Sequence, residues 1–365
     1  MMTADEIIEH LARRLPSFSP TASPQKLPDG YLSYVWRVRG WPHPVIVKVA
    51  PPHVATNPEL PLDPGRILFE ARSLRVLGAG GDLSYICSEA VRPPACLDFD
   101  VEAHALVMED VGDLPDLGEA LRQGADGPAL GTALGRFIGA LHATSLNDEQ
   151  LARKFNNLAM QRARFEVQYQ AVGEFCRKAD VAQADEIARR ATGLGERLLG
   201  PGICLIMGDL WPPSILVGGD SLRIIDWELA HFGNPAQDLG HLAAHLWMQA
   251  QRASTDAAAA NARSLWHSFL GAYVAAVGPL RGTLVAPGVI ADSEIHCGAE
   301  ILMRTVGPFH RGYLYDGLPS AAPDFQDALT SARQHILGHR RTCFAAIRSG
   351  EFSARRSTAS VADPG

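Results

Sequence analysis

The chain has little excess charge and no block of like charge. Its 365 residues include 33 lysines and arginines against 40 aspartates and glutamates, a formal net charge of −7. Nucleic-acid-binding surfaces usually carry a basic excess, and tails that bind DNA or lipid appear as runs of like charge. We therefore expect no nucleic-acid partner and no partner at a membrane surface.

Long apolar runs are also missing. No uncharged apolar segment reaches the length of about 18 residues that suggests a membrane-spanning helix. The N-terminal segment MMTADEIIEHLARRL is acidic and amphipathic, and it lacks the continuous apolar stretch of a signal peptide. These absences predict a cytoplasmic protein without a membrane span.

Two families of short motif are absent. The six cysteines, at positions 87, 96, 176, 204, 297 and 343, form no C-x-x-C pair, so their spacing predicts reduced, buried thiols rather than a disulfide framework or a zinc site. The chain also lacks a Walker-type G-x-x-x-x-G-K-[S/T] segment, which argues against a P-loop enzyme.

The chain is rich in ordinary core-forming residues. Hydrophobic residues make up 47% and charged residues 20%, a balance typical of globular proteins. The first third favours strands at 34–38, 44–49 and 105–108, a proline-rich loop at 51–64, and a helix over 67–77 with apolar residues at helical spacing.

The remainder of the chain is mostly helical in pattern. Helices are predicted from 117 to about 198 and from 238 to about 347, with a compact pair of strands at 203–206 and 222–225 between them. This order predicts an α+β fold of two lobes with a ligand in the cleft between them. We expect a nucleotide-binding lobe at 1–110, a catalytic and substrate lobe at 111–348, and a disordered tail at 349–365.

The most informative segments are 207–216 and 224–228. Phosphoryl transfer from ATP requires one carboxylate that orients the acceptor hydroxyl and takes its proton, and further carboxylates that hold Mg²⁺ against the phosphates. In kinases a metal ligand follows the catalytic aspartate by five residues, and Ser214 follows Asp209 at this spacing. Either Asp209 or Asp226 alone is typical of a turn. Their joint spacing predicts a catalytic Asp209, with Ser214 and Asp226 at the metal.

Glu228 adds a third carboxylate to this region. It follows Asp226 by two positions in an extended segment, so both side chains point to the same side and both could reach a metal ion. A surface glutamate is the alternative interpretation.

The N-terminal third supplies candidate nucleotide-binding residues. Lys48 ends the run Val45–Lys48, which is similar to the V-A-I-K segment of kinases. A buried lysine requires a charged partner, and Glu70 on the following helix is the expected one. Gly30 and Ser33 lie between two predicted strands, where backbone N–H groups could cover phosphates.

The segment 108–111 lies where a kinase connects its two lobes. Backbone groups of such a connector usually bind the adenine edge, so Met108, Glu109 and Val111 are predicted to contact the nucleotide. The side chains of Glu109 and Asp110 have the alternative of remaining solvated.

These residues resemble the aminoglycoside phosphotransferase and choline kinase superfamily, and within it most closely the S-methyl-5-thioribose kinases. The resemblance rests on four stretches: Asp29–Val38, Lys48–Leu74, Gly208–Ile215 and Asp226–Glu228. They are similar, in order, to a phosphate-covering loop, a lysine strand with its loop and helix, a catalytic loop with serine at the metal side, and an Asp-Pro-Glu metal motif. The resemblance implies an ATP- and Mg²⁺-dependent kinase that phosphorylates a small-molecule hydroxyl. A homodimer is left open.

The sequence departs from this family pattern at two places. Met207 replaces a histidine, as in the fungal 4-hydroxytryptamine kinase, which also has the Asp-Leu-Trp and Asp-Trp-Glu patterns. Trp211 is a candidate substrate contact. Methylthioribose kinases carry adjacent sugar-binding arginines in a late helix, whereas Met303 and Arg304 stand here, so only Arg304 is carried over as a substrate residue. The tandem Arg340–Arg341 is better explained as a solvated helix end.

Two further polar residues have structural interpretations. Asp238 resembles the aspartate that closes the family's metal loop, and we expect it to cap or brace that loop. His142 lies on an apolar helix face and is interpreted as a core histidine rather than a base.

Rival functions are a nucleotide-binding regulator without catalysis, favoured by Met207 and Ser214, and a protein kinase. The segment between Asp226 and Asp238 is too short to dock a peptide. The late helices are not acid-rich, as a polycationic aminoglycoside would require, so a sugar or small aromatic alcohol fits the acceptor better.

Overall fold

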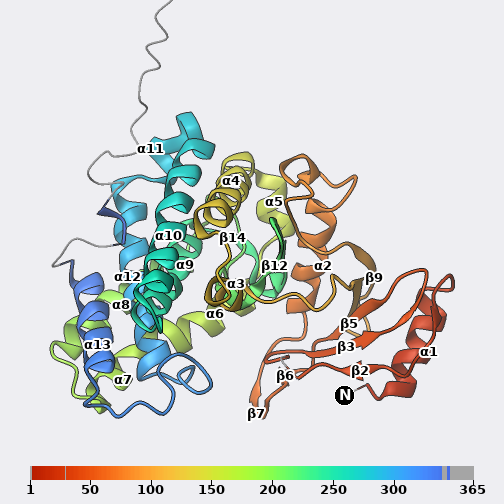
Figure 1. Ribbon diagram of the computed structural model, residues 1–365, viewed down its shortest axis with the longest axis horizontal. Helices are drawn as coiled ribbons and strands as arrows, with labels where there is room; N and C mark the ends of the chain where they lie inside the picture. The colour runs from red at the N-terminus through yellow and green to blue at the C-terminus, as the bar shows by residue number, and fades with distance from the viewer. Residues whose placement is uncertain (1, 29, 339–342, 346–365) are drawn as a thin grey trace, which may run out of the picture.

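The computed structural model describes residues 2–28, 30–338 and 343–345. A strand-rich region and a helical region lie side by side (Figure 1). The predictions made for Asp29, for Arg340–Arg341 and for the tail at 349–365 lie outside the described residues.

A five-stranded antiparallel sheet forms the core of the strand-rich region, in the order β2-β3-β5-β10-β9. Alternate side chains of its strands pack against α1 (Ala4–Arg14) on one face, and α2 (Arg66–Leu77) covers the other. Because side chains alternate along a strand, Val47 and Val49 pack against α1 whereas Lys48, between them, faces α2. The strands are β2 (Gln25–Lys26), β3 (Tyr34–Val38), β5 (Val45–Val49), β9 (Cys96–Asp100) and β10 (Ala105–Glu109).

The predicted strands and helix of this region are confirmed, but the proline-rich loop at 51–64 is wrong in part. This segment contains a hairpin of β6 (His53–Val54) and β7 (Asn57–Pro61). Proline is tolerated on edge strands, where its missing N–H breaks no ladder, and β7 is exposed along its whole length. A second small pairing joins β1 (Ser19–Pro20) to β4 (Gly40–Trp41).

The two strands predicted near the middle of the chain exist, but they do not pair with each other. β11 (Cys204–Ile206) pairs with β14 (His231–Gly233). β13 (Ser221–Ile224) lies between β12 (Ile215–Gly218) and β8 (Val91–Arg92). The partner strands β14, β12 and β8 were not predicted from the sequence, and β8 has only two residues. Asp209 follows the end of β11, and Asp226 follows the end of β13.

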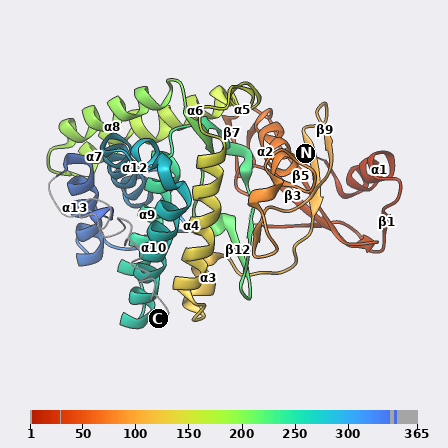
Figure 2. The same ribbon diagram turned by 90° about the horizontal axis from the view of Figure 1, so that it is seen from above.

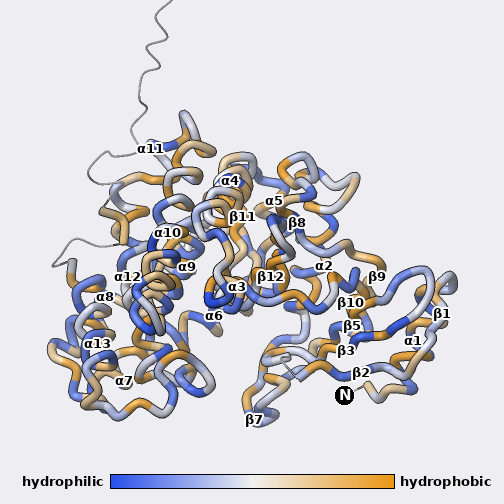
Figure 3. Tube along the Cα trace, in the orientation of Figure 1, coloured by the Kyte–Doolittle hydropathy of each residue, from blue (hydrophilic) through white to orange (hydrophobic). Residues whose placement is uncertain are grey.

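The helical region is built on a close contact between α4 and α10. A Cβ atom at Gly131 or Gly135 of α4 would lie 2.2 Å from the Leu265 carbonyl oxygen or 2.3 Å from that of Phe269, so these glycines allow the two backbones to approach. Figure 2 shows α4 between the later helices and the strand-rich region. Hydrophobic and hydrophilic residues alternate along the helices and strands (Figure 3).

The helices after the first sheet are α3 (Leu117–Arg122), α4 (Gly127–Thr144), α5 (Glu149–Lys154), α6 (Leu158–Arg164), α7 (Val172–Lys178), α8 (Ala184–Leu198), α9 (Ala236–Gln251), α10 (Asp256–Val277), α11 (Arg281–Leu284), α12 (Pro287–Thr305) and α13 (Pro323–Leu337). Short turns of other helix types are η1 (Ser84–Ile86), η2 (Phe165–Gln170), η3 (Pro212–Ser214), η4 (Trp227–Leu229) and η5 (Gly278–Leu280). Among the described residues, no single helix has the length and apolarity of a membrane span, although the bent pair Asp256–Leu284 and Pro287–Thr305 meets both criteria when taken together.

Candidate active site

Lys48 lies at the centre of three carboxylates. Its Nζ is 2.7 Å from Glu70 Oε2, 2.7 Å from Asp226 Oδ1 and 3.1 Å from Glu228 Oε1. The lysine is 3% exposed, and a buried ammonium requires such pairing. The structure thus brings together four predicted site residues, including the expected Lys48–Glu70 pair.

Glu228 is buried and uses both of its oxygens. Oε1 accepts from Lys48, and Oε2 lies 2.8 Å from Arg66 Nε and 3.2 Å from Ser33 Oγ. The interpretation of Glu228 as a surface glutamate is therefore wrong. Arg66, at the start of α2, was missed from the sequence because no motif marks it, although its guanidinium is fully buried and also donates to the carbonyl oxygens of Leu32 and Asp63.

These buried charges shift one another's protonation. Burial alone would lower the pKa of Lys48, but the carboxylates of Asp226, Glu228 and Glu70 outweigh it and raise that pKa well above its ordinary value. Burial and the neighbouring carboxylates raise the pKa of Glu70 to about 7 despite Lys48. Burial would raise the pKa of Glu228, but Lys48 and Arg66 lower it overall. The cluster therefore holds its lysine charged.

Asp226 is the most accessible carboxylate of the group. Its backbone is left-handed, with φ 61° and ψ 54°, a conformation that a residue with a side chain adopts at a cost of about 1–3 kcal/mol and that is common at functional sites. Its side chain is 45% exposed, against 1% for Glu70 and 6% for Glu228. Carboxylate oxygens of the three residues lie within 4.8 Å of one another. This oxygen-rich donor set fits Mg²⁺.

Asp209 lies on a loop that begins at the end of β11 and is held by its backbone. Gly208 has φ 82°, and a Cβ there would lie 2.3 Å from the Leu229 carbonyl oxygen, so only glycine fits. Asp238 of α9 accepts hydrogen bonds from the N–H groups of Met207 at 2.9 Å and Gly208 at 2.8 Å. The predicted bracing role of Asp238 is confirmed. His142 is buried beside the same carboxylate at 3.1 Å, as predicted for a core histidine.

The Asp209 carboxylate is paired with two cationic or polar side chains from other helices. Its Oδ1 lies 2.6 Å from Arg164 Nη2 and 3.3 Å from His241 Nε2. Burial would raise the pKa of Asp209, but the hydrogen bond from His241 and the charges of Arg164 and Arg304 lower it well below its ordinary value. Asp209 is therefore ionised. Arg164 and His241 were both missed from the sequence.

Ser214 lies at the turn that follows Asp209. Its buried hydroxyl lies 2.9 Å from the Trp211 carbonyl oxygen and 3.2 Å from that of Asp209, and it accepts from the Trp211 N–H at 3.4 Å. The hydroxyl has one proton to donate, so it closes this turn with one of the two carbonyls. Metal binding by Ser214 stays a prediction.

Trp211 and Arg304, the two predicted substrate residues, lie together. The Arg304 guanidinium carbon is 4.5 Å from the centroid of the Trp211 ring, 5.1 Å from that of Tyr313 and 5.5 Å from that of Phe309. Its Nε lies 2.7 Å from Glu300 Oε1. Arg304 is thus a cation fixed between aromatic faces and one carboxylate.

Two histidines on one face of α9 complete this side of the site. His245 Nε2 lies 3.0 Å from Glu300 Oε1, and its Nδ1 lies 2.6 Å from Tyr313 Oη. His241 Nδ1 lies 3.8 Å from Glu300 Oε2. Burial lowers the pKa of His245 to about 3, against the opposing effect of Glu300, so this imidazole is neutral. The His-x-x-x-His spacing, which places both side chains on one face of a helix, is the sequence pattern that could have indicated these residues.

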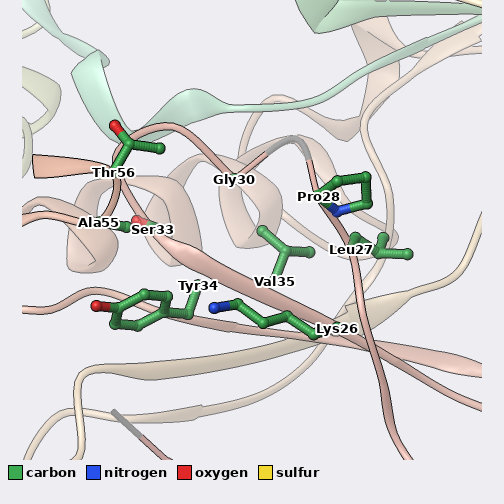
Figure 4. Close-up of a pocket in the computed structure, with 9 residues that line it drawn as sticks. All are labelled: Lys26, Leu27, Pro28, Gly30, Ser33, Tyr34, Val35, Ala55 and Thr56. Atoms are coloured by element: carbon green, nitrogen blue, oxygen red, sulfur yellow. The ribbon is translucent and has the colours of Figure 1, made fainter.

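The loop between β2 and β3 forms one wall of a cavity of about 330 Å³ (Figure 4). The opposite wall is the turn of the β6–β7 hairpin at Ala55 and Thr56. A Cβ at Gly30 would lie 2.2 Å from the Ser33 carbonyl oxygen, so glycine is needed for this tight loop. The structure therefore places Gly30 and Ser33 together. Their contact with phosphates stays a prediction.

The connector residues Glu109 and Asp110 are ion-paired, so the alternative of solvated side chains is wrong. Glu109 accepts from Arg92 Nη1 at 2.6 Å and Nη2 at 2.8 Å. Asp110 Oδ2 lies 2.7 Å from Arg37 Nε. The partners stand on β8 and β3, which the sequence does not show to be close. The remaining predicted residues of this segment lie alongside: Met108 is buried at the end of β10, and Val111 follows it half-buried.

Comparison with known proteins gives a consistent result. A profile of the phosphotransferase enzyme family, APH, matches residues 23–273. The chain is 25% identical to a 4-hydroxytryptamine kinase of Psilocybe cubensis over 263 residues, which cover 66% of this chain and 72% of that protein. It is 25% identical to a methylthioribose kinase of Geobacillus kaustophilus over 349 residues, which cover 86% of this chain and 84% of the relative.

A solved structure shares the fold. A choline kinase from Cryptosporidium parvum is similar with a TM-score of 0.53 at 13% identity, over 95% of this chain and 97% of that one. The predicted bilobal, protein-kinase-like α+β fold is confirmed. Because the family profile matches well over half of the chain, the protein belongs to the APH phosphotransferase enzyme family and is a phosphotransferase that acts on small-molecule hydroxyl groups.

Proposed function

We propose that the protein transfers the γ-phosphoryl group of ATP to a hydroxyl of a small metabolite. The observation that supports this most is the presence of two aspartates with different charged partners. Asp226 lies in the buried Lys48 cluster, and Asp209 lies on the neighbouring loop with its own cations. Lys48, held by Glu70, binds the α- and β-phosphates in this proposal, and Asp209 orients the acceptor hydroxyl.

The low pKa of Asp209 defines how it acts. A carboxylate with a low pKa stays ionised around neutral pH and can accept a hydrogen bond from the acceptor hydroxyl. The same low pKa makes it a weak base. A loose phosphoryl-transfer transition state needs little proton removal, and positioning and electrostatics supply most of the catalysis. Asp209 therefore positions the hydroxyl first and takes its proton late.

Mg²⁺ would be held by Asp226, with Glu228 as the second carboxylate. When bound, the ion neutralises charge that develops on the β- and γ-phosphates. Glu228 contacts Lys48 and Arg66 through both oxygens, so its main part is to hold Lys48 and Arg66 in place. The loop of Gly30 and Ser33 covers the phosphates, and the backbone at Met108, Glu109 and Val111 contacts the adenine.

The acceptor side favours a sugar or a small aromatic alcohol over a polycation. Its two carboxylates, Asp209 and Glu300, are each paired with an arginine, Arg164 and Arg304. Within these two pairs, no excess negative charge remains for a polycationic aminoglycoside. A methylthioribose-like sugar is the first candidate, since the methylthioribose kinase match extends over most of the chain. A small aromatic alcohol is the second, because the rings of Trp211 and Tyr313 lie beside Arg304, whose charge also acts on Asp209.

Incubation of the pure protein with Mg-ATP and a panel of hydroxylated metabolites tests the proposal. The panel contains methylthioribose, 4-hydroxytryptamine and an aminoglycoside, and mass spectrometry detects the phosphorylated product. We expect product from one of the first two and none in the Asp209→Asn variant. A protein that binds ATP but releases no more ADP than this variant with any acceptor would be a regulator, and the proposal would be wrong.

A further inference from the structure

Three potential metal ligands converge far from the phosphate site. Cys297 of α12, His335 of α13 and Cys343, which follows α13, each offer one ligand atom, and these atoms lie within 4.8 Å of one another. His335 Nε2 is 3.8 Å from Cys343 Sγ. Both cysteines are free thiols. None of the three residues contributes to the candidate active site.

Their spacing suits a tetrahedral metal. Zinc binds thiolates at about 2.3 Å and imidazole nitrogen at about 2.0–2.1 Å, and tetrahedral angles then place neighbouring ligand atoms roughly 3.5–3.8 Å apart. The separation of His335 Nε2 and Cys343 Sγ, 3.8 Å, lies at the upper end of this range. Thiolate and imidazole donors together favour zinc over the harder cations, which prefer oxygen.

An independent feature points to a ligand at His335. The Nδ1 atom of this ring lies 2.6 Å from Glu294 Oε2, and Glu294 is 2% exposed. A metal-binding histidine usually donates its second ring N–H to a carboxylate, which fixes the tautomer and the orientation of the ring. With Nδ1 directed to Glu294, Nε2 is the ring atom that lies beside Cys343.

The third ligand is fixed by packing that does not depend on a metal. The carbonyl oxygen of Cys343 accepts a hydrogen bond from Trp266 Nε1 at 2.7 Å. The next residue, Phe344, is fully buried and packs edge-on against the same tryptophan at 5.3 Å. Cys343 is therefore held against α10, within reach of the other two ligands, by neighbouring contacts.

We propose that Cys297, His335 and Cys343 form a zinc site, with Glu294 orienting His335 and a water completing the coordination. This site could not be predicted from the sequence, because its cysteines belong to no C-x-x-C pair. The packing of α12 on α13 (Figure 1) and the contacts of Cys343 and Phe344 with Trp266 of α10 bring the three residues together. Cys297 precedes Glu300 by one turn on α12, and Arg304 follows one turn later. The metal thus fastens the helix that carries the acceptor-side residues.

Metal analysis of the full-length protein tests this site without reference to kinase activity. We expect about one equivalent of zinc per chain after purification, lost in Cys297→Ser and Cys343→Ser but kept in Cys87→Ser, whose thiol is similarly half-buried. Chelation should lower the melting temperature of the wild type and of Cys87→Ser, and should leave that of Cys343→Ser unchanged.

Titration of the wild-type protein with cobalt tests the zinc site even if a cysteine variant fails to fold. Addition of Co²⁺ to the chelator-treated wild type should produce the thiolate-to-cobalt absorption band of a two-cysteine site. No band together with no zinc in the wild type would overturn the proposal. A disulfide between Cys297 and Cys343, found by mass spectrometry of freshly purified, metal-free protein, would replace it with a redox pair.

Discussion

The two groups of residues that we propose as the phosphate side, around Lys48, and the acceptor side, around Asp209 and Glu300, are built differently. On the phosphate side, three carboxylates surround Lys48, with Arg66 as the second cation. On the acceptor side, Asp209 and Glu300 are matched by Arg164 and Arg304. Negative charge therefore exceeds positive charge on one side only. That side fits a metal cation, whereas the other offers no excess negative charge that would favour a polycationic acceptor.

The two sides also differ in how far their residues lie apart along the chain. The lysine strand, its helix and the Asp-x-Glu segment follow patterns of fixed local spacing. The acceptor side is assembled from α6, α9 and α12, which contribute Arg164, His241 with His245, and Glu300 with Arg304. The first arrangement can be predicted from local spacing, whereas the second depends on how distant helices pack.

Replacing Lys48 should have the largest effect on activity, and this effect should be confined to the use of ATP. We expect Lys48→Met to lower kcat/KM for ATP by about 10²–10³-fold, on the scale of a lost electrostatic contact in a dry site. It should also lower the free energy of unfolding by about 3–5 kcal/mol, because the buried carboxylates lose their cation. Steady-state kinetics and urea titration measure both effects. Lys154→Met, which removes an exposed pair with Asp82, is the control and should change neither.

Replacing Arg164 should affect the acceptor side and should lower kcat by less than the Lys48 replacement lowers kcat/KM. Because Arg164 helps to hold the pKa of Asp209 low, Arg164→Met should raise that pKa and move the acidic limb of the kcat profile to higher pH. We expect kcat at neutral pH to fall roughly 10-fold, with little change in KM for ATP. A pH–rate profile measures the shift. An unmoved acidic limb would contradict the assignment, and Arg153→Met, at an exposed pair, is the control.

Trp211 tests whether the aromatic wall recognises the acceptor. Trp211→Ala should raise KM for the acceptor by about 5–10-fold, on the scale of one aromatic contact, and should leave KM for ATP unchanged. Kinetics with each substrate varied separately measures the two constants. Equal changes in KM for the acceptor and KM for ATP would contradict the assignment of Trp211 to the acceptor side alone. Trp41→Ala, at a largely exposed position of β4, is the control and should change neither constant.

Glu70 should give the smallest effect, visible as a pH dependence of stability. Its folded pKa of about 7 lies above the ordinary value of 4.5. Its contribution to stability is therefore fully present below about pH 4.5 and is lost as the pH rises through 7. Glu70→Gln should remove a decline in stability, on the order of 1 kcal/mol, between pH 5 and 8. Urea titrations across this range measure it, and Glu59→Gln on exposed β7 should retain the decline.

The sequence predicted much of the phosphate side because its signals are local. Lys48 follows a β-branched run, Glu70 stands on a helix with clear periodicity, and Asp226 with Glu228 ends a strand. The sequence could not show that Arg66 is buried against Glu228. Arginine at the start of a helix gives no such signal, and the contact depends on η4 packing against α2.

The acceptor side and two details of the fold could not be predicted for the same physical reason. The partners of Asp209 come from helices that are far apart in the sequence and meet only by tertiary packing. The two histidines of α9 could be recognised as site residues only once Glu300 was seen beside them. The strand at 203–206 pairs with β14, and the strand at 222–225 pairs with both β12 and β8. These pairings join segments that are brought together only in the folded chain. The hairpin at 53–61 was hidden by its prolines, which an edge strand tolerates.

Acceptor-dependent ADP release by the wild type and by Asp209→Asn, measured side by side, tests the central claim most directly. The wild type should release ADP only when its acceptor and Mg²⁺ are both present. Asp209→Asn should bind ATP normally and lose about 10²-fold or more in kcat, while Asp220→Asn, on the exposed β12–β13 turn, should match the wild type. Near-wild-type turnover by Asp209→Asn would contradict the account.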